Sequence, residues 1–395
     1  MNNKIVVLFL LAVFGLNAQD VNNKIGVTKE LTNKKGSEYK FTVVKNLDAT
    51  AVQNQNMTGT CWSFSSMSFF ESELIRMGKG KDYNFSEMFV ARKAYPVKAD
   101  NFIRMHGKNN MGEGGGFPDA IFVLRNYGMM PEEAYTGKKD IKDKHNHGQL
   151  ESALISLTKS TVEREKIDFE AAHSSIESIC DAFLGKVPEK FEYKGKTYTS
   201  KTYAEATGIN ADDYVFITSF THHPFYSKFT LEVPDNWNWE QMYNVPLSDL
   251  KEIMNSAIQG GYTFAWAADV SEKTFLFKDG IAIIPEKSFE TMTPEEKKEM
   301  SLKPQTQLTI TQEIRQKAFD NYETQDDHGM HIVGIVKDQN GINYYMVKNS
   351  WGTELNECDG YFFASENYVL YKTTNIMLHK KALPSGIAKK LGIAQ

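Results

Sequence analysis

Three side chains have the types and spacing needed for nucleophilic amide hydrolysis: a cysteine, a histidine and an asparagine. Cys61 follows the segment QNMTGT and precedes an amphipathic run, so we expect it at the N-terminus of a helix. The unpaired N–H groups and positive dipole there favour the thiolate, which is the nucleophilic form. The backbone N–H of Cys61 and the side-chain amide of Gln55 are the expected donors to the oxyanion of a tetrahedral intermediate.

The histidine and the asparagine are expected to meet across a β-hairpin. His331 opens an apolar run, HIVGIV, and Asn349 closes another, NYYMVKN, with the turn signal DQNG between them. A turn centred on Asn340 places His331 opposite Asn349 on one face. Asn349 would then fix the tautomer of the imidazole, and Trp351 would cover their hydrogen bond from water. His328, in a polar run just before the strand, ranks second as the base.

The pattern of apolar residues predicts an α+β chain with two lobes. Helical patterns dominate from Cys61 to about residue 184, and short strand patterns between turns follow from residue 191. We expect a mainly helical lobe at about 50–250, with an insertion at about 134–214, and a sheet-rich lobe at about 251–380. A tail at 381–395 closes the chain, and active residues come from both lobes.

Composition and charge limit the class of protein. The chain has 395 residues, 41% of them hydrophobic, which is enough for a large core. With a net charge of -5, the chain lacks the excess of positive charge that favours binding to nucleic acid or stable association with an anionic membrane. Residues 1–19 have the charged start, short apolar run and small-residue exit of a secretory signal. We therefore expect an exported protein, periplasmic or secreted, whose mature chain begins near residue 20.

Cysteine and histidine patterns predict neither a metal nor a cofactor. The chain has three cysteines, so at least one thiol is unpaired within it. Cys180 and Cys358 either form one disulfide or fill apolar interior space separately. The pairs His145-Asn-His147 and His222-His223 lack the spacing and the ligand company of a zinc site.

The two halves of the motif together resemble the papain-like cysteine peptidases. Gln55, Cys61-Trp62 and Asn349-Ser-Trp-Gly352 match the pattern of that family. The resemblance implies a helical lobe and an antiparallel, barrel-like sheet lobe that face each other across a cleft, with Gln55 in the oxyanion hole.

A glycine run adds to this likeness. The segment EGGGFP at 113–118 resembles the stretch with which the family binds the substrate backbone. Gly115, Gly116 and Trp351 are therefore the expected substrate-binding residues. Peptides are the implied substrates.

Two further traits resemble the bleomycin hydrolase family of cysteine aminopeptidases. The number of residues between Cys61 and His331 in the sequence is nearly twice that usual in papain-type peptidases, and few residues precede Gln55. This likeness implies aminopeptidase activity through a thioester, a homohexamer, and a C-terminal tail that enters the cleft. The chain departs from the family at Thr60, where arginine is common, and in its basic end SGIAKKLGIAQ.

The departures leave two alternatives open. The chain could be a papain-like endopeptidase if the tail does not block the cleft. It could also be a catalytically inactive binding protein that keeps the papain fold.

Overall fold

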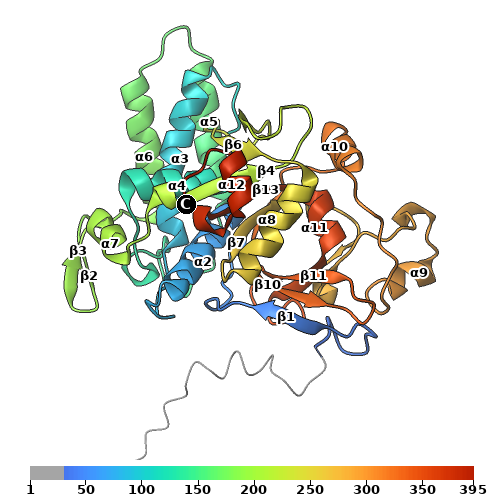
Figure 1. Ribbon diagram of the computed structural model, residues 1–395. Coiled ribbons are helices and arrows are strands. Elements are labelled where there is room, and N and C mark those ends of the chain that lie inside the picture. Colours follow the sequence, from blue (N-terminus) through green and yellow to red (C-terminus); the bar gives the residue numbers. More distant parts are fainter. Residues whose placement is uncertain (1–30) are drawn as a thin grey trace, which may run out of the picture.

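The computed structural model describes residues 31–395, and the expected secretory signal lies outside the described residues. Two lobes lie side by side in Figure 1, one built from helices and the other from a large sheet with helices around it. This arrangement confirms the predicted α+β fold with a helical lobe and a sheet lobe.

The helices of the two lobes differ in position along the chain. Those of the helical lobe are α2 (Cys61–Arg76), α3 (Glu87–Arg104), α4 (Phe117–Tyr127), α5 (Gly148–Val162), α6 (Phe169–Leu184) and α7 (Ser200–Thr207). Those around the sheet are α8 (Leu247–Gln259), α9 (Pro294–Glu299), α10 (Gln312–Asp320), α11 (Glu366–Lys372) and α12 (Ser385–Lys390).

The main sheet of the described residues has eleven strands in the order β5-β6-β4-β13-β7-β10-β11-β12-β9-β8, with β1 paired to β10. Their bounds are β1 (Thr42–Asn46), β4 (Tyr214–Thr218), β5 (Lys228–Thr230), β6 (Gln241–Asn244), β7 (Phe264–Ala268), β8 (Phe275–Leu276), β9 (Ile281–Ala282), β10 (His328–Lys337), β11 (Asn343–Lys348), β12 (Tyr361–Ser365) and β13 (Thr373–His379). A separate hairpin pairs β2 (Phe191–Tyr193) with β3 (Lys196–Tyr198).

The sheet differs from the prediction in two respects. It is mixed rather than antiparallel, because β4 pairs with β6, and β9 with β12, in parallel. Strands β1 and β4 to β6 also belong to it, although they precede residue 251. The boundary between the lobes is therefore not a single point near residue 250. The chain enters the sheet with β1, crosses to the helical lobe, and returns at β4.

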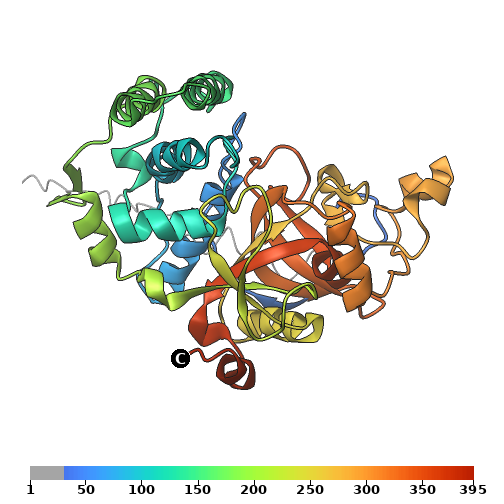
Figure 2. The ribbon, with the colours of Figure 1, turned by 90° about the horizontal axis from the view of Figure 1, so that it is seen from above.

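Helix α2 joins the lobes. It packs along β10 and is buried on nearly all sides. Phe69 and Phe70 have no exposed surface, and both rings pack against Tyr214 of β4. Burying two such rings stabilises the junction by several kcal/mol, at about 1.5–3 kcal/mol for each side chain. Because α2 contacts the helices of one lobe and the strands of the other, it lies at the boundary between the two lobes (Figure 2).

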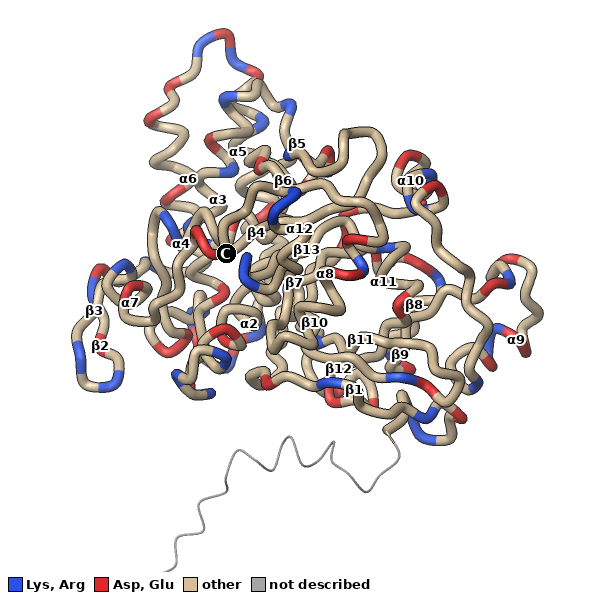
Figure 3. The backbone as a smooth tube through the Cα atoms, in the orientation of Figure 1, with Lys and Arg blue, Asp and Glu red and all other residues tan. Residues whose placement is uncertain are grey.

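The outer surface carries both signs of charge. In Figure 3 acidic and basic positions alternate around the outline of both lobes. Among the residues that the structure describes, no helix has the length and apolar character to cross a bilayer.

Candidate active site

Cys61 is the first residue of α2 and lines a cleft of about 470 Å³, open mouth included. Its thiol is half-buried, and its backbone N–H has no carbonyl partner within the helix because it occupies the first helical position. Burial, together with the carboxylates of Asp235 and Asp326, raises the pKa of Cys61 to about 12, although the backbone N–H of Gly329 acts in the opposite direction. An isolated Cys61 thiol is therefore neutral, and it needs a base to become a nucleophile.

The imidazole in the same cleft is that of His328, the first residue of β10. Its Nε2 lies 2.8 Å from Oδ1 of Asn349. That oxygen also accepts the backbone N–H of Ser350 at 2.8 Å, which fixes the orientation of the amide. Nε2 must therefore carry the ring proton, and the lone pair of Nδ1 is left as an acceptor.

Trp351 covers this pair. Its ring lies 4.7 Å from the His328 ring, centroid to centroid, at an interplanar angle of 33°. His328 is buried, and burial lowers its pKa to about 4 even though the hydrogen bond to Asn349 raises it. The tryptophan therefore shields the imidazole from water, as predicted, but for a different histidine.

The prediction of His331 as the base is wrong in its geometry. His331 pairs across the hairpin with Lys348, not with Asn349. Its Nδ1 contacts Oγ of Ser68 at 2.9 Å, and Nε2 has no hydrogen-bond partner among the described residues. The ring lines a second cavity with Lys348 and Glu71, and it is not among the residues that line the cleft at Cys61.

A β-bulge explains this difference. The turn is centred on Asn340 as predicted, and pairs such as Val336 with Tyr344 follow from it. Between Ile332 and Gly334 the register shifts by one residue. A shift of one residue turns the side chains on the far side of the bulge from the turn to the opposite face of the sheet. His331 is one of these residues, so it points away from Asn349.

Gln55 is held by the segment that follows Asn349. Its Oε1 accepts the hydroxyl of Ser350 at 2.6 Å, and its backbone N–H donates to the Ser350 carbonyl at 2.8 Å. Its Nε2 donates one hydrogen to the carbonyl of Thr58 at 2.7 Å, in the turn that leads to Cys61. The second hydrogen of that amide is the one available to an oxyanion. The donor role of Gln55 stays a prediction.

The glycine run forms one wall of the cleft. Gly115 and Gly116 both line it, as predicted. A Cβ on Gly114 would lie 2.2 Å from Oδ2 of Asp235, and one on Gly115 would lie 2.6 Å from Oδ2 of Asp119. These two glycines therefore make room for carboxylates. A Cβ on Gly116 would meet its nearest atom, Cδ of Pro118, at 3.1 Å, so the backbone there is more open to a ligand.

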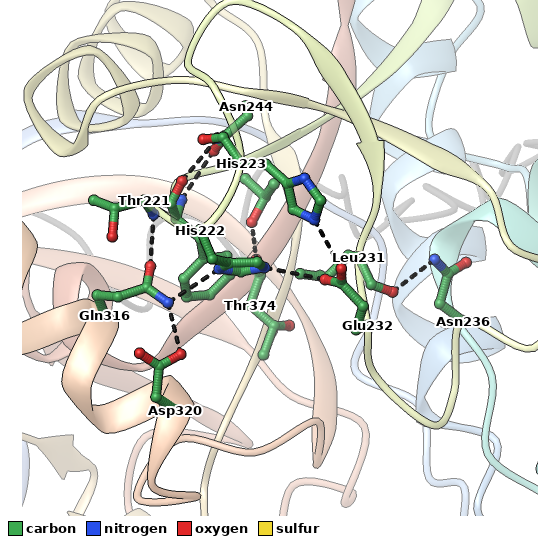
Figure 4. A network of polar contacts seen from close by, with 12 residues as sticks. Thr221, His222, His223, Leu231, Glu232, Asn236, Asn244, Gln316, Asp320 and Thr374 are labelled. Carbon is green, nitrogen blue, oxygen red and sulfur yellow. Dashed lines mark hydrogen bonds and ion pairs between the residues drawn. The ribbon is translucent and has the colours of Figure 1, made fainter.

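The loop at residues 231–240 lies against the glycine run and also lines the cleft. A hydrogen-bond network holds this loop in place (Figure 4). Nε2 of His222 and Nε2 of His223 contact the two oxygens of Glu232 at 3.0 and 2.8 Å. Asn236 Nδ2 donates to the carbonyls of Leu231 and Glu240, both at 3.0 Å. Glu232 therefore ties the loop to the segment that follows β4, and Asn236 ties the two ends of the loop to each other.

The two histidines and Glu232 also lie close enough together to hold a metal ion. Gln316 argues against that use, because its Nε2 donates to Nδ1 of His222 at 3.0 Å while its Oε1 accepts the backbone N–H of Thr221 at 2.6 Å. Nδ1 of His222 is thus an acceptor, and Nε2 carries the proton. A histidine that binds a metal normally donates from its other nitrogen, so the network fits a hydrogen bond to Glu232 better.

Cys61, Cys180 and Cys358 are all free thiols, so the alternative of a disulfide is wrong. The tail does not enter the cleft within the described residues. Helix α12 buries Ile387 and Ala388 in the core that includes α8, and Gln395 Nε2 donates to the carbonyl of Leu383 at 2.6 Å.

Comparisons with known proteins agree with this architecture. The model of the Peptidase C1-like family matches residues 93–393. Aminopeptidase E of Lactobacillus helveticus is 20% identical over 386 residues, covering 85% of this chain and 82% of the relative. Aminopeptidase C of Listeria monocytogenes serovar 1/2a is 23% identical over 374 residues, covering 84% of this chain and 80% of the relative.

A solved structure gives the same result for the fold. PepW from Lactobacillus rhamnosis HN001 superposes with a TM-score of 0.68 at 20% identity, and the match covers 89% of this chain and 84% of PepW. With its cysteine, histidine and asparagine arranged as described, the chain belongs to the Peptidase C1-like family and is a cysteine peptidase of papain-like fold.

Proposed function

We propose that the protein is an aminopeptidase that releases the N-terminal residue of peptides through a thioester at Cys61. The observation that carries the mechanism is the hydrogen bond of 2.8 Å between His328 Nε2 and Asn349 Oδ1, in the cleft that Cys61 also lines. The names of the relatives, which are aminopeptidases, support the specificity for the amino end.

The first step couples proton transfer to attack. Nδ1 of His328 accepts the proton of the Cys61 thiol, and the sulfur adds to the carbonyl carbon of the scissile amide. Burial disfavours a lone charge on either group, as their opposite pKa shifts indicate. When the proton moves from one to the other, the two charges form together and attract each other, which offsets part of that desolvation.

The later steps use the same groups. The oxyanion accepts the backbone N–H of Cys61 and the free hydrogen of the Gln55 amide. His328 returns its proton to the leaving amine, and the thioester remains. A water molecule, deprotonated by His328, then hydrolyses the thioester. Asn349 holds the ring in the orientation that both steps need, and Trp351 keeps water from their hydrogen bond.

A pair of coumarin substrates tests this proposal. Wild-type protein should release aminomethylcoumarin from alanyl-aminomethylcoumarin and leave the N-acetylated compound nearly intact. Cys61→Ala should abolish release, whereas Cys358→Ala, which removes a half-buried thiol outside the cleft, should retain it. Efficient cleavage of the acetylated compound would identify an endopeptidase, and no cleavage of either would favour an inactive binding protein.

Export and assembly complete the proposal. The charged and apolar start of the sequence supports export of the protein to the periplasm or the medium. Mass spectrometry of the N-terminus after expression in the native host tests this, and a mature chain that still begins at Met1 would contradict it.

The resemblance to bleomycin hydrolases supports a homohexamer, which light scattering of the purified protein would detect.

A further inference from the structure

Three side chains that line the cleft present hydrogen-bond acceptors, and we call them the acidic wall. Asp235 comes from the loop at 231–240, Asp326 from the segment before β10, and Asn375 from β13. All three line the cleft that contains Cys61 and His328. The steps of hydrolysis described above use none of them.

The two carboxylates are held close to each other. The backbone N–H of Asp235 donates to Oδ2 of Asp326 at 3.0 Å, and Oδ1 of Asp235 accepts Nδ2 of Asn110 at 2.7 Å. Burial raises the pKa of both aspartates, that of Asp326 to about 7, with a further contribution from Asp235. Keeping both ionised in this position is unfavourable unless a cation lies nearby.

Among the residues that the structure describes, one cation acts on both carboxylates. Lys98 is buried, its Nζ donates to the carbonyl of Gly114, and its charge acts on both carboxylates. Asp119 is close to the same lysine, but its oxygens are already used by the indole N–H of Trp237 at 2.8 Å and by other donors. One lysine therefore faces three aspartates.

Asn375 provides a separate sign that a ligand binds here. Its side chain is 5% exposed, and its Oδ1 has no hydrogen-bond partner among the described residues. Its Nδ2 makes only a long contact, 3.4 Å, to Oγ1 of Thr374. A buried carbonyl oxygen without a donor is unfavourable, so a donor from a ligand in the cleft would stabilise it.

We propose that Asp235, Asp326 and Asn375 bind the α-ammonium group of the substrate. An ammonium group has three N–H donors, carries a positive charge and accepts no hydrogen bond, which matches two carboxylates and one amide oxygen. The inference rests on the proposed aminopeptidase function and supplies its specificity. An acetylated N-terminus has lost the charge and two of the donors, so it gains little from this wall.

Isosteric variants test the assignment. Asp235→Asn and Asp326→Asn each remove a charge and keep the shape, and Asn375→Ala removes the neutral acceptor. Glu240→Gln is the matched control, because it removes one exposed charge from the same loop outside the cleft. For each protein, kcat/KM is measured with alanyl-aminomethylcoumarin and with its N-acetyl form, after titration of the reactive thiol with iodoacetamide.

Loss of a charged hydrogen bond lowers the preference for the free amine by about tenfold or more in either aspartate variant, mainly through KM. Asn375→Ala lowers it by about three- to tenfold, and Glu240→Gln changes it by less than about twofold. Thermal unfolding of each variant shows whether it is folded. If one aspartate variant does not fold, the other decides the question.

Three results separate the possible failures. A wild-type protein that prefers the acetylated compound contradicts the proposed function itself. A wild-type protein that prefers the free amine, with folded aspartate variants that keep this preference, overturns only the ammonium site. Rapid cleavage of acetyl-arginyl-aminomethylcoumarin that is lost in the aspartate variants would assign the wall to a basic side chain and would also overturn the proposal.

Discussion

The exchange of each histidine for glutamine separates a catalytic from a structural imidazole. His328→Gln and His331→Gln are matched changes, since both residues lie in β10 and both are buried. Glutamine has a similar size and keeps an amide that can donate a hydrogen bond, but it cannot accept a proton from a thiol. The two variants therefore lose the same chemistry at two places three residues apart.

The structure predicts very different losses of activity. Removing a general base lowers kcat by about 10²- to 10⁴-fold, which is about 2.7–5.4 kcal/mol of transition-state stabilisation. We expect a loss of this size for His328→Gln. His331 contacts Ser68 rather than the cleft. Its replacement removes one hydrogen bond, which destabilises the fold by about 1 kcal/mol, and should change kcat/KM by less than about tenfold.

Steady-state cleavage of alanyl-aminomethylcoumarin gives kcat/KM for both variants, and urea unfolding gives their stability. Circular dichroism is the check that both variants are folded. An inactive His331→Gln together with an active His328→Gln, both of native stability, would refute the assignment of the base and with it the importance of the bond to Asn349.

Other changes test single features of the cleft. Asn349→Ala should lower kcat/KM by about tenfold or more, measured at constant active-site concentration, because the ring of His328 loses the acceptor that fixes its tautomer. Asp326→Asn should raise the free energy of unfolding at pH 7 by about 1–2 kcal/mol, measured in urea. Burial raises the pKa of Asp326 from 3.8 to about 7 on folding, so the penalty of ionising it grows between about pH 4 and pH 7 and is complete above pH 7. The gain in stability from the exchange should therefore vanish near pH 4. Asp235→Asn should increase the rate at which iodoacetamide alkylates Cys61 at pH 7, because one of the charges that raise the thiol pKa is gone.

The helix and hairpin at the site could be predicted from local patterns. The amphipathic run after Cys61 is α2, and the signal DQNG gives the turn between β10 and β11. Gly341 has the positive φ of 82° that such a turn requires. These features depend on residues that are neighbours in the chain, so their pattern is visible in the sequence.

The choice of histidine could not be predicted because its cause is distant. The register shifts beside Gly334, where a Cβ would lie 2.7 Å from the carbonyl oxygen of Lys45 in β1. The close approach of a strand far away in the sequence accompanies the bulge. Without it, His331 would face Asn349 as predicted. Nothing local to the run HIVGIV indicates that one residue is displaced.

The acidic wall was missed for a similar reason. In the sequence, Asp326 and Asp327 stand in a polar run, DDHG, that is typical of a solvated turn, whereas in the structure Asp326 is half-buried in the cleft. Trp237 is buried, and its indole N–H ties the loop at 231–240 to Asp119. A sequence signal did exist in the run of three glycines, because only a residue without Cβ leaves room for the carboxylate of Asp235 beside position 114.

The position of the two carboxylates links specificity to the reactivity of the thiol. Without substrate, Asp235 and Asp326 raise the pKa of Cys61, and so they oppose formation of the thiolate. An ammonium group bound between them would neutralise part of their field. The same contact that holds a free N-terminus would therefore make proton transfer from Cys61 to His328 easier. A substrate with a blocked N-terminus would be cleaved more slowly for two reasons, because it binds more weakly and because it leaves the nucleophile in its less reactive form. This dependence gives an acidic cleft wall a role in catalysis as well as in recognition.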